Sequence, residues 1–325
     1  MPNNLSKLRL LLYVLLPFAF FVILVGAYTR LTDAGLGCPD WPGCYGHWFL
    51  GKGSLGMDDF IKAWTEMFHR YIAGFLGLGI LFLSIFSKQK LVAKSLLILV
   101  IFQALLGMWT VTEKLRPIIV MGHLLGGMGI ISLLWLLFLE NVYKKEINSG
   151  GFKPRLSASL ALSLRPLAAL SLGILILQII LGGWTSANYA ALVCPNWYYC
   201  DNLVFNVDNL LMALNPLAGI PVDPALAMPY PGKVILNMMH KINAFLTAAV
   251  IVWLCVKLFK KTDNKTLRRT ALVLSGLLML QIYLGFQNVL KLLPLWAAVA
   301  HNGVAVLLLL ALITINYHLS SKPSH

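Results

Sequence analysis

One stretch of this chain occurs twice. Residues 26–44 return 156 positions later as residues 182–200, and two cysteine pairs are among the positions that match: Gly26/Gly182, Thr29/Thr185, Ala34/Ala190, Leu36/Leu192, Cys38/Cys194, Pro39/Pro195, Trp41/Trp197 and Cys44/Cys200. So dense a match predicts two copies of one structural unit within the chain. Whatever the unit does is then expected to be done, in some form, in both copies.

The composition is that of a protein embedded in a membrane. Of the 325 residues, 59% are apolar and only 12% are charged, whereas soluble domains carry about 25% charged residues. Apolar runs near the roughly 20 residues that cross a bilayer as a helix recur eight times, at about residues 10–29, 69–87, 92–112, 118–139, 162–184, 236–259, 270–290 and 294–317. The predicted fold class is an all-α polytopic membrane protein with eight transmembrane helices.

The first apolar run follows two basic residues, as a signal peptide would. Its repeat partner lies in mid-chain and cannot be a signal, so we expect a retained span. Four spans per half predict two pseudo-symmetric four-helix bundles, related by an axis along the membrane normal. The expected units are residues 1–145 and 162–325, joined by a cytoplasmic linker at 146–161.

Basic residues predict the orientation in the membrane. With the N-terminus placed inside, 17 of the 26 lysines and arginines fall on the inner side, which is the side that such residues favour. Both termini are therefore expected to be cytoplasmic. The net charge of +14 is then explained by topology and gives no indication of nucleic-acid binding.

All but one of the cysteines fall in outer loops on this topology. That side of a bacterial membrane permits disulfides, so Cys38–Cys44 and Cys194–Cys200 are plausible bridges. Cys255 stands alone within a span, where a cysteine is usually a small buried apolar residue.

The repeat continues beyond the cysteine loops. Residues 102–111 match residues 280–289 at an offset of 178. The growth of the offset places about 22 extra residues in the second half, mostly in the loop 201–235. Residues 201–214 are expected to form a short interfacial helix, and the sequence gives the insertion no role.

Four of the seven histidines lie in or at the start of even-numbered spans, near their outer ends: His69, His123, His240 and His301. Each half thus contributes one histidine pair from two helices. Two imidazoles that face each other across a four-helix bundle can ligate haem iron from both sides. A metal ion without porphyrin is disfavoured, since the second half has no Asp, Glu or Cys at this depth. The alternative is that these histidines are hydrogen-bonded contacts between helices.

The halves differ beside the first histidine of each pair. Glu66 precedes His69 by three residues and shares its helix face, while Asn237 takes the equivalent position in the second half. A carboxylate at only one site suggests that one site reacts and the other carries electrons. Alternatively, Glu66 caps the helix start or pairs with Arg70 at the surface. Both interpretations stay open.

As a set, these features resemble the bacterial haem A synthases, over nearly the whole chain. The features are Glu66-x-x-His69-Arg70, the later histidines His123, His240 and His301, and the loop Gly37-Cys38-Pro-Asp-Trp-Pro-Gly-Cys44. The proline-rich stretch 215–232 departs from the shorter loop expected of that family, which leaves open how the second site is covered.

The resemblance implies an enzyme of the bacterial inner membrane that oxidises a methyl group of haem O to a formyl group. The product, haem A, would serve terminal oxidases. By the same resemblance, a resident haem b is held by His240 and His301, and haem O lies between His69 and His123. Glu66 would lie beside the methyl group as the catalytic residue. The cysteine pairs would stabilise loops or relay reducing equivalents.

The expected partners are haem O and membrane lipid, with haem O synthase and an electron donor or acceptor as further candidates. The oligomeric state stays open. A di-haem b electron carrier would need the same histidines without the Glu66/Asn237 difference. A thiol–disulfide exchanger would depend on the cysteines instead. A transporter is disfavoured because the intramembrane acids needed for ion coupling are missing from the sequence.

Overall fold

The computed structural model describes residues 3–51, 55–87, 90–143, 158–196, 200, 204–217 and 227–320. All regular elements within these ranges are helical: α1 (Asn3–Leu31), α2 (Met57–Phe86), α3 (Lys90–Thr112), α4 (Pro117–Phe138), the π-helix η1 (Leu139–Tyr143), α6 (Ala158–Ala187), α7 (Val207–Leu214), α8 (Tyr230–Lys261), α9 (Lys265–Leu290) and α10 (Leu295–Ser320). Eight of these helices are long and apolar enough to cross a membrane. The predicted number of spans is confirmed, and the chain is a multi-pass membrane protein.

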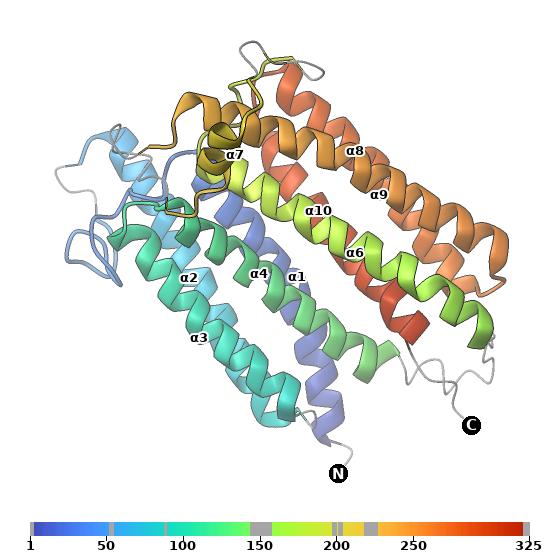
Figure 1. Cartoon of the computed structure of the whole chain (residues 1–325). Helices are drawn as coiled ribbons and strands as arrows, with labels where there is room; N and C mark the ends of the chain where they lie inside the picture. Colours follow the sequence, from blue (N-terminus) through green and yellow to red (C-terminus); the bar gives the residue numbers. More distant parts are fainter. Residues whose placement is uncertain are drawn as a thin grey trace.

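The long helices form two closed rings of contacts (Figure 1). α1, α2, α3 and α4 contact one another in sequence and α4 returns to α1, while α6, α8, α9 and α10 do the same. The rings meet where α10 contacts α1 and α4, and where α4 contacts α6. Because α10 packs on both rings, it is the most enclosed of the eight spans. Most of the expected linker, residues 144–157, lies outside the described residues.

One large apolar cluster runs through both rings. It includes Leu12, Ile80, Leu134, Leu254 and Leu312, whose side chains are fully buried. The outward faces carry equally apolar but exposed side chains, among them Phe75, Phe82, Ile98 and Leu272. A surface of this kind is stable against lipid tails, which are as apolar as the side chains that meet them.

The second span begins earlier than its apolar run. α2 starts at Met57, so the expected start at residue 69 is wrong by about three helical turns. Asp58 and Asp59 occupy the first turn, where negative charge is favoured by the helix dipole. The polar residues in these first turns are not part of the apolar run, but they are part of the helix. His69 therefore lies well inside α2.

The short helix of the long loop also begins later than expected. α7 starts at Val207 because the side chain of Asn206 accepts a hydrogen bond from the backbone N–H of Asn209 at 2.8 Å, an N-cap. Residues 201–203, the first part of the expected helix, lie outside the described residues.

The turns after α1 and α6 have the same backbone conformation. Asp33 and Tyr189, which are equivalent in the repeat, have φ angles of 51° and 52°. The next residue in each half, Ala34 or Ala190, donates its N–H to the carbonyl five residues earlier, at 3.0 and 2.9 Å. The sequence repeat is thus accompanied by a repeat of local structure.

Candidate functional site

The four predicted histidines lie inside the two rings of helices. His69 of α2 and His123 of α4 lie next to each other in an edge-on arrangement, with ring centroids 6.4 Å apart and ring planes at 81°. His240 of α8 and His301 of α10 are close enough to interact electrostatically. The structure therefore brings the histidines together in the pairs that the sequence indicated.

A glycine on a neighbouring helix faces every one of these rings: Gly26 faces His69, Gly107 faces His123, Gly182 faces His240 and Gly285 faces His301. A Cβ atom added to Gly26 or Gly182 would lie 2.9 Å from the histidine Cε1, closer than such atoms can approach. At the other two glycines the distances would be 3.2 and 3.4 Å. The glycines thus make the space that the imidazoles occupy.

Sequence reasoning did not connect these glycines with the histidines. The signal was present, because Gly26/Gly182 and Gly107/Gly285 stand at equivalent positions in the repeat.

Several imidazole nitrogens lack protein partners. The Nδ1 atoms of His69, His123 and His301 are buried and have no hydrogen-bond partner among the described residues. Leaving such an atom unpaired costs about 1–3 kcal/mol. When two imidazoles share one metal, the distance between their centroids is the sum of two metal–nitrogen bonds of about 2.0–2.1 Å and the two ring radii. That sum is close to the separation of the His69 and His123 rings. In the separation of its rings, the first pair therefore fits an iron held between two imidazoles.

Two equivalent glutamines contact the later histidine of each pair. Gln103 donates its side-chain N–H to the backbone carbonyl of His123 at 2.7 Å. The Nε2 atom of Gln281 lies 3.2 Å from Nε2 of His301. Both contacts join the third helix of a ring to the fourth.

Glu66 is buried, and each of its two carboxylate oxygens accepts a hydrogen bond. Its Oε1 accepts a hydrogen bond from Arg70 Nη2 at 2.6 Å, and its Oε2 accepts one from the backbone N–H of Cys38 at 2.9 Å. Arg70 also donates to the carbonyls of Asp40 and Gly43, at 3.0 and 2.6 Å. The pair joins α2 to the first cysteine loop.

The two alternative roles of Glu66 are thereby separated. Its pairing with Arg70 is confirmed, although the pair is buried and not at the surface, since Glu66 is 5% exposed. The capping role is wrong, because α2 begins nine residues earlier, at Met57.

In the second half, a neutral and a basic side chain join the helix to the cysteine loop. The Asn237 amide donates to the carbonyl of Ala190 at 2.8 Å. Lys241 donates to the carbonyls of Cys194 and Asn196 at 3.0 and 2.7 Å. A carboxylate is therefore not required to attach a cysteine loop to its helix, and the negative charge is what distinguishes the first site.

Both predicted cysteine pairs are confirmed as disulfides. Cys38–Cys44 and Cys194–Cys200 each have a Cα–Cα distance of 4.9 Å, and all four residues are buried. Disulfide exchange needs access to the sulfur atoms, so their burial favours loop stabilisation. Cys255 is free and buried, as expected.

A polar cluster joins the two halves beside these loops. Arg30 forms an ion pair with Asp33 at 3.4 Å, and it also donates to the carbonyl of Ser186 at 2.8 Å. Its guanidinium lies 4.2 Å from the centre of the Tyr189 ring, whose hydroxyl donates to Asp33 at 3.1 Å. Burial raises the pKa of that hydroxyl above its ordinary value, against the opposing effect of Arg30. Arg30 and Ser186, like Asp33 and Tyr189, are equivalent repeat positions.

The sequence of almost the entire chain matches one family. The match is to the COX15-CtaA family, described as cytochrome oxidase assembly protein, and covers residues 9–313. The chain belongs to this family.

Three relatives match almost the whole length of the chain. A protein of Shewanella oneidensis named heme A synthase is 45% identical over 98% of both chains. Proteins of the same name from Flavobacterium psychrophilum and Mesorhizobium japonicum are 27% and 24% identical, over 93% and 94% of this chain and 95% and 89% of their own.

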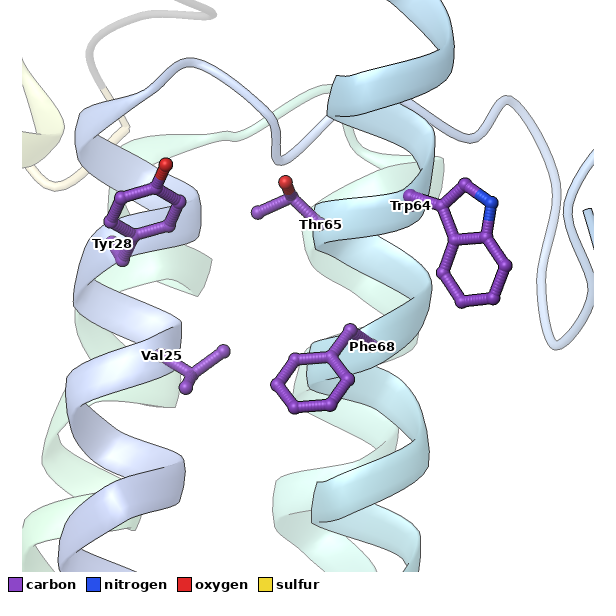
Figure 2. A pocket seen from close by; sticks show the side chains of 5 residues that line it. All are labelled: Val25, Tyr28, Trp64, Thr65 and Phe68. Carbon is purple, nitrogen blue, oxygen red and sulfur yellow. The ribbon is translucent and has the colours of Figure 1, made fainter.

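An apolar groove of about 360 Å³ opens on the outside of the α1–α2 seam. Figure 2 shows Val25 and Tyr28 of α1 opposite Thr65 and Phe68 of α2, with Trp64 beyond them. Val25 and Phe68 directly precede Gly26 and His69 in the sequence. The groove therefore lies beside the point where the first histidine packs against its glycine.

Proposed function

We propose that this protein is a haem A synthase, an oxidoreductase that converts a methyl substituent of haem O into a formyl group. The carbon loses four electrons and gains one oxygen atom, in successive oxidations. The observation that carries the proposal is the presence of two histidine pairs, of which only one has a buried carboxylate beside it. The name of the relatives that match the full length supports the same reaction.

The two halves have different tasks in this proposal. The N-terminal half, residues 1–145, binds haem O between His69 and His123, and the 6.4 Å separation of their ring centroids supports this. The C-terminal half, residues 162–325, holds a resident haem b through His240 and His301. When bound, haem b supplies a carrier for single electrons. Residues 146–161 link the halves.

Glu66 is the catalytic residue of this proposal. Its carboxylate is one helical turn from His69, and its 2.6 Å contact with Arg70 holds it in position. A carboxylate there can accept a proton as the methyl carbon is oxidised, or stabilise positive charge on that carbon. The second half, with Asn237 at this position, lacks such a group.

The protein is assigned to a bacterial inner membrane, with both termini in the cytoplasm and the histidine pairs towards the outer face. The distribution of basic residues supports this orientation. Equal turns at Asp33 and Tyr189, and direct contacts between equivalent positions, support two pseudo-symmetric bundles. Haem O synthase and an electron donor or acceptor are the proposed partners.

Haem extraction and pyridine-haemochrome spectra test the assignment. The purified protein is expected to contain haem b alone when made without haem O synthase, and also haem O and haem A when made with it. His240→Ala and His301→Ala should remove haem b, because each substitution deletes one of the two side chains that would hold it. His47→Ala, in a loop, is the control. Haem b that is never accompanied by haem A would instead favour the di-haem electron carrier.

The groove between α1 and α2 is the proposed site of the hydrocarbon tail of haem O, since its lining is largely apolar and it adjoins His69. Thr65→Trp should fill it and raise the KM for haem O several-fold, with haem b content unchanged. Phe82→Trp, on the exposed face of the same helix, is the control. An unaltered KM in Thr65→Trp would place the tail elsewhere.

A further inference from the structure

A chain of polar side chains extends from His240 into the second ring of helices. Gln178 of α6 places its Nε2 atom 3.1 Å from Nδ1 of His240. Asn243 of α8 donates to Oε1 of Gln178 at 2.8 Å, and its amide lies 3.5 Å from the hydroxyl of Thr247. Asn243 and Thr247 are both buried. His240 therefore has a side-chain partner that is itself held by a second residue.

The first half has no counterpart of this series of polar side chains. The positions equivalent to Gln178, Asn243 and Thr247 are occupied by Val22, Ile72 and Leu76. All three are buried in the apolar cluster. Correspondingly, Nδ1 of His69 has no hydrogen-bond partner among the described residues. His69 and His240 thus both pack against a glycine, but only His240 has a side-chain partner at Nδ1.

This difference affects how strongly an imidazole holds a metal. When one ring nitrogen binds the metal, the other carries the proton, and a hydrogen-bond acceptor there fixes the ring and makes it a stronger donor to the metal. An amide can provide the acceptor, because rotation exchanges its oxygen and nitrogen. Gln178 Nε2 also donates to the backbone carbonyl of His240 at 3.2 Å. If Gln178 turns its oxygen towards Nδ1, it exchanges that bond for one to Asn243, which turns with it and accepts from the Gln178 NH₂ group. This series of polar side chains therefore suits a histidine that binds iron through Nε2.

We infer that Gln178, oriented by Asn243, is a positioning residue that makes His240 a permanent haem ligand. The apolar replacements in the first half leave His69 a ligand that exchanges. This inference rests on the proposed function, in which haem b stays in the second half while haem O enters the first and haem A leaves it. A resident cofactor requires slow dissociation, whereas a substrate site requires release after each reaction.

The test compares Gln178→Val, which introduces the residue of the first half, with the wild-type holoprotein. Haem b release is followed as transfer to apomyoglobin, and the midpoint potential is measured by redox titration. Release should accelerate about tenfold or more. The potential should rise, because a weaker histidine donor stabilises ferric iron less. Ser171→Ala, which removes a buried hydroxyl bonded within α6, is the control and should change neither.

Asn243→Ile provides a second, independent variant. It retains Gln178 but removes the group that orients it, and should change release and potential in the same direction by a smaller amount. Wild-type release and potential in both variants would overturn the inference. Failure of the proposed function is recognised separately, because wild-type protein would then contain no haem b or form no haem A.

Discussion

Glu66→Gln is expected to reduce haem A formation by about 100-fold or more, while the absorption spectrum of haem b stays unchanged. Glutamine keeps the size of the side chain and can still accept the hydrogen bond from the Cys38 amide. In the second half the neutral Asn237 already attaches a cysteine loop to its helix. The substitution therefore removes the charge and the hydrogen bond from Arg70, while the Cys38 amide and the bonds of Arg70 to two loop carbonyls keep the loop attached.

The measurement is conversion of haem O by purified protein, quantified by haem extraction, with haem b content as the internal standard. Asp59→Asn is the matched control, because it removes a carboxylate from the exposed first turn of the same helix. Undiminished haem A formation in Glu66→Gln would refute a catalytic role for this carboxylate.

Gly26→Ala and Gly182→Ala are expected to have large and different effects. Each new methyl group would lie 2.9 Å from a histidine Cε1, and the ring must move because the helices around it are packed. Misplacement by about 1 Å can cost about 100-fold in rate. Gly26→Ala should therefore impair haem A formation and spare haem b, whereas Gly182→Ala should lower haem b content.

Two further glycines provide controls on helices of the same two halves. Gly74 on α2 and Gly173 on α6 have open space where a Cβ atom would lie, so alanine should be tolerated at both. Purified variants are compared by haem content per protein and by conversion of haem O. If Gly26→Ala and Gly182→Ala behave like these controls, the glycines do not determine where the imidazoles lie.

Much of the architecture could be predicted from the sequence, because a membrane requires long apolar helices and the repeat marks equivalent positions. The number of spans and the two disulfides followed from these constraints. The start of α2 did not, since Asp58, Asp59 and Glu66 interrupt the apolar run without interrupting the helix. A count of apolar residues measures the lipid-facing length and misses turns that carry polar groups.

The surroundings of the histidines were harder to predict. A sequence gives the spacing along one helix, but which residue of a neighbouring helix meets His240 depends on the rotation of both helices. Gln178 lies 62 positions from His240, and no local pattern connects them. Gly26 could have been found, since the repeat retains it as Gly182, but its contact with an imidazole required the structure.

The contacts of Arg30 and Asp33 with Ser186 and Tyr189 join equivalent positions of the two copies. In a symmetric dimer of separate identical chains, such positions meet their own counterparts, so arginine would face arginine and aspartate would face aspartate. Within one chain the copies vary independently, and a cation can lie on an aromatic ring. Joining the copies therefore removes the requirement for self-complementarity at the axis, and the seam between the halves can be built from unlike partners.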